Sequence, residues 1–168
     1  MAGGSIIVTG ASKGIGAAIV TELEHRGFVV YGLSRSGESP GQNAVICDVT
    51  DEAAVRTAFA DIAGDGPIAG LVNNAGVHIG GPTQRLPTSD FEAVMALNVT
   101  AVMVCSREVY PHFDVNGGGK IVNLGSFFDR MGVPHNLAYC ASKAAVAALT
   151  RCLAVEWARK RINVINVA

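Results

Sequence analysis

A tyrosine and a lysine four residues apart, Tyr139 and Lys143, have the clearest chemical potential in this sequence. Residues at positions i and i+4 share one face of a helix, so the lysine ammonium can lie beside the phenol. An unperturbed tyrosine has a pKa of about 10, and a nearby cation favours the phenolate form. Such a tyrosine can exchange a proton with an alcohol or carbonyl oxygen. The alternative for an isolated pair of this kind is an ordinary surface contact on a helix.

A serine, Ser126, follows a short apolar run at residues 120–124 and precedes the Tyr–Lys pair. In an open α/β sheet, ligands bind at the carboxyl ends of the strands. We therefore expect Ser126 and the Tyr–Lys pair to meet at that end of a sheet.

A glycine-rich turn, TGASKGIG at residues 9–16, joins the first apolar run to an expected helix. Glycines there permit a tight turn and a close approach of the backbone to a diphosphate. Free N–H groups at the helix start would then hold the phosphates. The spacing is G-x-x-x-G-x-G, which differs from the common dinucleotide fingerprint, and a purely structural turn is the alternative. The candidate cofactor contacts in this turn are Gly10, Ser12, Lys13, Gly14, Ile15 and Gly16.

The next apolar run ends in Ser34 and Arg35, with Arg35 lying 19 positions after Gly16. An acidic residue at this place would bind the ribose hydroxyl of NAD, whereas an arginine accommodates the 2′-phosphate of NADP. Lys13 could add a second positive charge. The sequence therefore favours NADP(H) over NAD(H), the alternative being a solvated surface arginine.

Short apolar runs alternate with amphipathic stretches along the whole chain, as in a parallel sheet covered on both faces. We find no repeat or linker and predict a single domain over residues 1–168. Thr50 is a plausible N-cap of the second helix. The expected strands are 5–9, 28–33, 44–47, 68–72, 120–124 and 162–167; the expected helices are 14–26, 51–63, 89–113 in one or two pieces, and 137–160.

The composition is that of a folded domain: 168 residues, 49% hydrophobic and 16% charged. A net charge of −1 gives no electrostatic basis for binding nucleic acid or an anionic membrane. We recognise no signal peptide and no continuous apolar run of about 18 residues, so we expect a cytoplasmic protein without a membrane span. No metal-ligand spacing is present, and we expect reduced, buried thiols at Cys47, Cys105, Cys140 and Cys152.

In their order and spacing, these motifs resemble the short-chain dehydrogenase/reductase family in its shorter, single-domain form. The matching residues are TGASKGIG at 9–16, NNAG at 73–76, Asn98, Ser126, and Tyr139-x-x-x-Lys143. The resemblance covers essentially the whole chain. It implies a doubly wound, Rossmann-type α/β fold with strand order 3-2-1-4-5-6 and NADP(H) along the strand ends.

The resemblance also implies a role for each residue of the site. Tyr139 would be the general acid/base, and Ser126 would hydrogen-bond the carbonyl of a small-molecule ketone or secondary alcohol substrate. Lys143 would hold the nicotinamide ribose and stabilise the Tyr139 phenolate. Asn98 would support a water that relays protons through Lys143; without the resemblance, it would be a capping or kink-forming asparagine.

Further cofactor contacts are implied after the third and fourth strands. Asp48 and Val49 would touch the adenine ring, although a helix-start acid and a core valine are the alternatives. Asn74, Ala75 and Gly76 would line the adenine ribose and brace the sheet. On the substrate side, the resemblance places two histidines, His78 and His135, which are either substrate contacts or plain loop residues.

Two departures from the family pattern stand out. Position 125 is glycine where the family often has a second serine, and the sequence stops at Ala168, before the substrate-covering segment and seventh strand that the family leads us to expect. The stop favours an alternative: a truncated dinucleotide-binding module without turnover. A halohydrin dehalogenase on the same scaffold is disfavoured, because Lys143 and the glycine turn are both present.

The helices expected at residues 99–113 and 137–160 are apolar on most sides and must be covered on more than one face. Val102, Met103 and Val104 would join a symmetric subunit contact. The family resemblance likewise implies a homodimer or homotetramer through these helices, the alternative being that the missing C-terminal part covers this surface.

Overall fold

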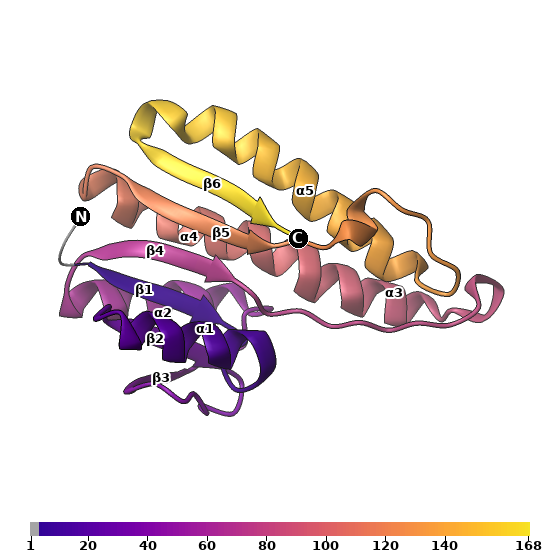
Figure 1. The fold of residues 1–168 in the computed structure, drawn as a ribbon, viewed down its shortest axis with the longest axis horizontal. Helices are drawn as coiled ribbons and strands as arrows, with labels where there is room; N and C mark the ends of the chain where they lie inside the picture. The colour runs from indigo at the N-terminus through magenta and orange to yellow at the C-terminus, as the bar shows by residue number, and fades with distance from the viewer. Residues whose placement is uncertain (1–3) are drawn as a thin grey trace.

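Six parallel strands form one sheet in the computed structural model, which describes residues 4–168 (Figure 1). The order is β3-β2-β1-β4-β5-β6, and every neighbouring pair is parallel. The predicted strand order is confirmed. The strands are β1 Ser5–Thr9, β2 Val30–Ser34, β3 Asn43–Ile46, β4 Ile68–Asn73, β5 Gly119–Leu124 and β6 Ile162–Val167.

Helices pack on both faces of this sheet (Figure 1). One face packs Val8 and Val30 against Val20 of α1, and the other packs Ile121 against Phe59 of α2 and Phe113 of α4. α5 lies on the second face as well, through half-buried side chains near its end. The helices are α1 Gly14–His25, α2 Glu52–Asp65, α3 Thr88–Met95, α4 Ala101–Val115 and α5 Leu137–Trp157.

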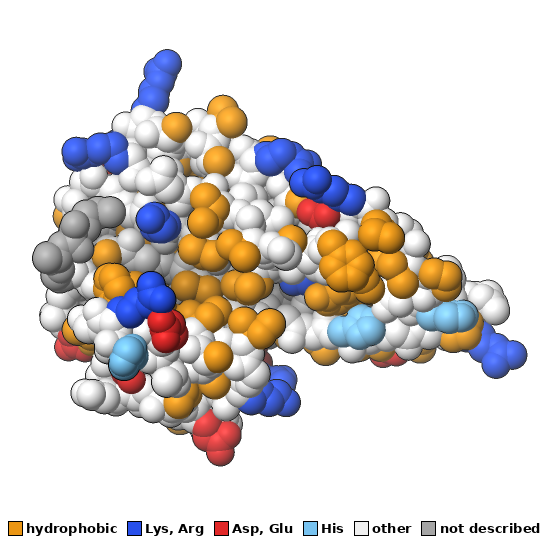
Figure 2. All heavy atoms as spheres, in the orientation of Figure 1, with side chains coloured by type: hydrophobic (Ala, Val, Ile, Leu, Met, Phe, Trp, Pro, Cys, Tyr) orange, Lys and Arg blue, Asp and Glu red, His pale blue; other side chains and the backbone are white. Residues whose placement is uncertain are grey.

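The sheet is only partly covered on the α1 face. Over β4 and β5, in the middle of the view in Figure 2, hydrophobic side chains gather in a hollow. Val122 and Leu124 of β5 are half-buried there, whereas Ile165 and Val167 of β6 are exposed. The edge strand β6 pairs with β5 alone.

Element ends differ from the predicted ones where side chains compete for backbone groups. The N-cap of α2 is Asp51, not Thr50, because the Asp51 carboxylate accepts hydrogen bonds from the N–H groups of Ala53 (2.9 Å) and Ala54 (3.2 Å). The hydroxyl of Thr50 donates instead to Asp48 (2.7 Å).

The stretch predicted as one or two helices over residues 89–113 contains α3 and α4, joined by a π-helical turn at Ala96–Thr100. A π turn accommodates one more residue than an α-helical turn does, and such turns are frequent at functional sites. Asn98 lies within this turn and is only 1% exposed. The local widening thus occurs at a residue that the sequence singled out.

Two expectations about buried side chains were wrong. Cys152 is exposed and Cys140 half-buried, and only Cys47 and Cys105 are buried thiols. Burial raises the pKa of Cys47 to about 11 and that of Cys105 to about 12. Val102 and Val104 also lie in the core of this chain, so neither can supply a subunit contact.

By length and composition alone, Thr88–Val115 and Leu137–Lys160 could each cross a membrane. In the fold, both stretches contain helices that pack along the sheet, and 33% of each apolar window is buried.

A series of hydrogen-bonded, buried polar side chains runs along this face of the sheet from α4 to α5. Asn73 of β4 donates to Ser106 of α4 (3.2 Å) and to its neighbour in register, Asn123 of β5 (2.9 Å). Asn123 in turn donates to the hydroxyl of Thr150 on α5 (2.9 Å), which donates to the carbonyl of Val146 (2.8 Å). A buried polar group left unpaired costs free energy of folding. These hydrogen bonds therefore fix the position of α5 on the sheet.

We predict that Thr150→Val lowers the free energy of unfolding by about 1–3 kcal/mol, because it leaves the Asn123 amide without its acceptor. Urea denaturation measures the change. The matched control is Thr21→Val on α1, since the Thr21 hydroxyl also donates to a carbonyl four residues earlier but is exposed. Equal losses in the two variants would contradict the assigned role.

Candidate active site

The glycine turn between β1 and α1 leaves its backbone open to a ligand. Gly10 and Gly14 have φ angles of +67° and +58°, which favour glycine. A Cβ on Gly10 would lie 2.8 Å from the Cα of Ala75, whereas one on Gly14 would meet nothing within 4 Å. Lys13 precedes α1 without capping it through its side chain. The first turn of α1 therefore keeps free N–H groups, as a diphosphate requires.

Thr9 and Asn74 join the carboxyl ends of β1 and β4. The Thr9 hydroxyl accepts from the N–H groups of Asn74 (3.1 Å) and Ala75 (3.0 Å), and the Asn74 amide donates to the carbonyls of Thr9 (2.9 Å) and Gly10 (3.1 Å). Chain connections leave these two central strands in opposite directions, which is where open α/β sheets form their binding crevice. These four hydrogen bonds hold the glycine turn beside that crevice, next to the exposed Gly76.

Arg35 is exposed just after the end of β2, near Asp48. Hydrogen bonds from the backbone N–H (3.0 Å) and hydroxyl (2.7 Å) of Thr50 lower the pKa of Asp48, and the positive charge of Arg35 lowers it further. The Arg35 guanidinium and the Asp48 carboxylate thus lie at the same corner of the sheet. Val49 is 6% exposed and belongs to the core, so little of its surface is left for a ligand.

Sequence reasoning missed a carboxylate in the turn after β2. The Ser34 hydroxyl donates to the backbone carbonyl of Glu38 (2.8 Å), which folds the turn back on itself. The Glu38 carboxylate then accepts from the hydroxyl of Ser36 (3.2 Å). Glu38 is three residues beyond Arg35 in the sequence, and this fold-back brings its negative charge next to the residue that follows Arg35.

Lys143 on α5 reaches the carboxyl end of β5, where its ammonium donates to the carbonyl of Leu124 (2.7 Å). The residue is 8% exposed, and burial lowers its pKa. Its Nζ lies 5.5 Å from the centre of the Tyr139 ring. An ammonium has three protons, so two remain for other acceptors at this site.

Ser126 and Tyr139 both keep hydroxyl protons available for a ligand. The Ser126 Oγ accepts from the N–H of Phe128 (3.2 Å), where it caps the 3-10 turn Phe127–Asp129. The Tyr139 ring packs edge-on against Phe128 (5.8 Å between centroids) and His78 (4.9 Å). Within residues 4–168, neither hydroxyl donates a hydrogen bond to another residue. Both can therefore donate to a substrate oxygen.

Asn98 fixes the two segments beside this site. Its amide donates to the carbonyl of Val77 (2.9 Å) and to the hydroxyl of Ser142 (3.1 Å), and its Oδ1 accepts from the N–H of Val77 (2.8 Å). Ser142, which is fully buried, donates to the carbonyl of Tyr139 (2.8 Å). Both amide protons of Asn98 are thus used, and only an Oδ1 lone pair is left to hold a water. The role of Ser142 was missed because a serine within a helix has no signature in the sequence.

Comparison with known proteins agrees with this geometry. The family described as short chain dehydrogenase matches residues 5–168. This chain belongs to that family.

A curated relative in the short-chain dehydrogenase family is gluconate 5-dehydrogenase of Gluconobacter oxydans, 33% identical over 100% of this chain and 71% of its own length. A solved short-chain dehydrogenase from Streptomyces avermitilis has a TM-score of 0.93 at 30% identity, covering 99% of this chain and 65% of its own. A third, described as a putative NAD(P) dependent gluconate 5-dehydrogenase from Beutenbergia cavernae with bound NADP, has a TM-score of 0.89 at 31% identity and covers 99% of this chain and 71% of its own. The chain therefore has the dinucleotide-binding fold of the short-chain dehydrogenases.

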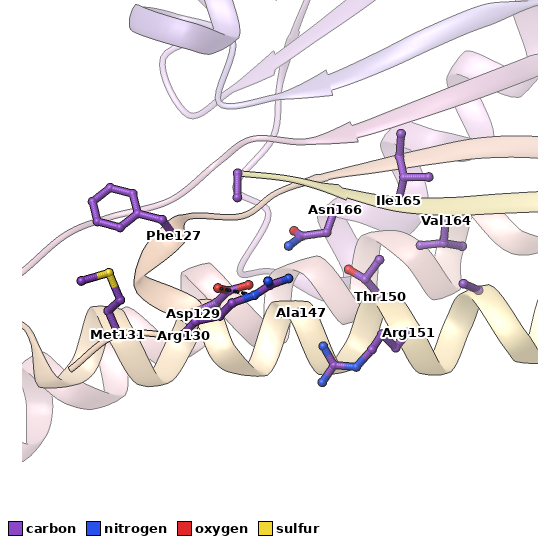
Figure 3. Close-up of a pocket in the computed structure, with 12 residues that line it drawn as sticks. Phe127, Asp129, Arg130, Met131, Ala147, Thr150, Arg151, Val164, Ile165 and Asn166 are labelled. Atoms are coloured by element: carbon purple, nitrogen blue, oxygen red, sulfur yellow. Dashed lines mark ion pairs between the residues drawn. The ribbon is translucent and has the colours of Figure 1, made fainter. Parts of the chain in front are cut away.

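No group of three or more His, Cys, Asp or Glu within residues 4–168 could hold a metal ion. A hollow of about 780 Å³ lies between α5, β6 and the Phe127–Asp129 turn (Figure 3). Neither Tyr139 nor Lys143 lines it. Figure 3 shows Thr150 and Asn166 in the space between α5 and β6.

Asn166 accounts for the glycine at position 125, where the family often has serine. A Cβ on Gly125 would lie 2.5–2.8 Å from the amide atoms of Asn166. Oδ1 of Asn166 is buried and accepts no hydrogen bond from residues 4–168. The two positions are therefore coupled: a larger residue at 125 requires the Asn166 amide to move or a smaller residue at 166.

We predict that Gly125→Ser lowers the melting temperature and that adding Asn166→Ala recovers most of the loss, because the alanine removes the overlapping amide. Thermal unfolding of the two single variants and the double variant measures the coupling. Additive effects would mean that the Gly125 backbone, and not the Asn166 side chain, excludes serine.

Proposed function

We propose that this protein transfers a hydride between NADP(H) and a carbonyl or secondary alcohol substrate in the cytoplasm. The observation that carries the proposal is the convergence of Ser126, Tyr139 and Lys143 at the carboxyl end of β5. The open glycine turn follows β1, and because β1, β4 and β5 are parallel it lies at the same carboxyl ends of the strands. An acid/base group and a phosphate-binding turn at the carboxyl ends of the same sheet suit dinucleotide-linked redox chemistry.

The chain's own residues supply the proton chemistry. The Ser126 hydroxyl donates to the carbonyl oxygen and holds it close to the Tyr139 phenol. Tyr139 gives its proton to that oxygen during reduction and takes one from the alcohol during oxidation. The bound nicotinamide supplies or accepts the hydride. The Lys143 ammonium stabilises negative charge on the phenol and has protons left for the ribose hydroxyls.

Replacement of the proton lost by Tyr139 has a route through this architecture. Burial eases loss of a proton from Lys143, since it lowers the pKa of that ammonium. The free lone pair of Asn98 Oδ1 can hold a water near the start of α5. We propose that protons from bulk water reach Tyr139 by way of that water and Lys143.

Residues along the strand ends would hold the cofactor. The turn containing Gly10, Gly14 and Gly16 suits the diphosphate, with Ser12, Lys13 and Ile15 in the same segment. Arg35 beside Ser34 suits a 2′-phosphate, and the Beutenbergia relative was solved with NADP. Glu38 opposes this preference with a negative charge in the same turn. Asp48, Val49, Asn74, Ala75 and Gly76 complete the proposed adenosine side.

We predict that Arg35→Asp weakens NADPH binding at least tenfold and changes NADH binding far less, because the new carboxylate repels the 2′-phosphate. Fluorescence titration of each nucleotide gives the dissociation constants. Arg159→Asp, an exposed exchange just before β6 and hence at the opposite, amino ends of the strands, is the charge-matched control. If Arg35→Asp raises the dissociation constants of NADPH and NADH by the same factor, Arg35 does not contact the 2′-phosphate.

We also predict that Tyr139→Phe lowers kcat by about 10²–10⁴-fold and leaves NADPH binding within twofold of the original, since only the proton donor is lost. Ketone reduction is followed by the absorbance of NADPH. Tyr110→Phe is the matched control. It removes the hydroxyl of a tyrosine whose ring packs on Trp157, away from the site, and should keep full activity. Unchanged kcat in Tyr139→Phe would assign the acid/base role elsewhere.

The second candidate function is dinucleotide binding without turnover. The observation behind it is that neither Tyr139 nor Lys143 lines the hollow between α5, β6 and the Phe127–Asp129 turn. The chain spans 65–71% of the length of the relatives compared above. NADPH binding without reduction of any ketone in a broad panel would favour it.

Subunit assembly through α4 and α5 also stays a prediction, supported by apolar Val155, which is 81% exposed on α5.

A further inference from the structure

The loop after β4 and the loop before α5 are fastened together beside Tyr139. The N–H of Gly81 donates to the carbonyl of His135 (2.8 Å), and the imidazole of His78 hydrogen-bonds the amide of Asn136. His135 has a φ of +67°, which is uncommon outside glycine and turns its carbonyl toward the other loop. These contacts bring the exposed His78 ring against the edge of the Tyr139 ring.

The orientation of the Asn136 amide fixes which nitrogen of His78 has the proton. The Nδ2 of Asn136 donates to the carbonyl of Pro134 (2.8 Å), so its Oδ1 is the atom that meets His78 Nε2. An amide oxygen only accepts hydrogen bonds, and Nε2 must therefore be the protonated nitrogen of the neutral ring. The other ring nitrogen, Nδ1, then has a free lone pair and acts as an acceptor.

The His78 ring contacts Tyr139 from the loop side, away from the sheet. Lys143 extends from Tyr139 toward the sheet, where it is bound to Leu124. The remaining neighbours of the ring, His78 and Phe128, come from loops beyond the strand ends. His78 is exposed, and the backbone of the preceding Val77 is held on both its N–H and its carbonyl by Asn98. The imidazole is thus a fixed polar group beside an otherwise aromatic wall.

We propose that His78 is a specificity residue, whose Nδ1 accepts a hydrogen bond from a hydroxyl on the carbon next to the reacting carbonyl. The inference rests on the proposed function, since it takes Tyr139 as the group that meets the reacting oxygen. It assigns the substrates to the α-hydroxy ketones and the corresponding vicinal diols. A plain ketone leaves Nδ1 without its donor and gains nothing from His78.

The test compares 3-hydroxybutan-2-one with butan-2-one, two ketones that differ by one hydroxyl. We expect the purified protein with NADPH to reduce the hydroxy ketone with a kcat/KM at least tenfold higher. His78→Phe keeps a ring against Tyr139 but has no acceptor, and it should bring the two values within about twofold of each other. In His78→Phe, kcat/KM should fall far more for 3-hydroxybutan-2-one than for butan-2-one, whereas a general loss of structure would lower both by the same factor.

Two further variants separate the acceptor from the loop. His78→Asn places an amide near the position of Nδ1 and should restore part of the preference. His135→Asn changes the other histidine while tolerating its positive φ, and should keep the full preference. Equal rates for the two ketones in the original protein, or a preference that survives in His78→Phe, would overturn the inference. Absence of NADPH oxidation with both ketones would instead remove the proposed function, and this inference with it.

Discussion

One buried amide, that of Asn98, holds the segments from which the candidate site is built. Its hydrogen bonds fasten the backbone of Val77 on one side and the hydroxyl of Ser142 on the other. His78 follows the first of these residues, and Tyr139 and Lys143 flank the second along α5. Because Asn98 is only 1% exposed, losing one of these bonds leaves a buried polar group without its protein partner, which is costly. Asn98 lies in the π turn, so this local irregularity of the helix is where the segments of Val77 and Ser142 are joined.

The layers of the fold could be predicted because its strands leave few alternatives. Apolar runs such as SIIVT in β1 can be buried on both faces only in a parallel sheet with helices around it, and the motifs then fixed the strand order through the family resemblance. Element ends were harder to place. Asp51 and Thr50 are both good N-caps by residue type. Asp51 caps α2 because the Thr50 hydroxyl is already bound to the Asp48 carboxylate.

The site was predictable where chemistry dictates residue type, and not where packing does. A Tyr–Lys pair at i and i+4 must share a helix face, so that part follows from the sequence. The coupling of Gly125 to Asn166 depends on two adjacent strands, and the bond between His78 and Asn136 on two loops 58 residues apart. Nothing local in the sequence marks such pairs. Glu38 was overlooked for the same reason, since only the fold-back of the turn brings it to Ser36.

The strand order also affects how the chain is assembled during synthesis. The central strand β1 is made first, yet the bond from Thr9 to the carbonyl of Val72 on β4 spans 63 residues. At about 5–20 residues per second, a ribosome needs roughly 3–13 seconds to make that interval. During this time β1 can pair only with β2, and its other edge offers unpaired backbone groups to any strand nearby. The binding crevice between β1 and β4 therefore begins as an open edge of the nascent chain, and this is the stage at which a chaperone would have most to protect.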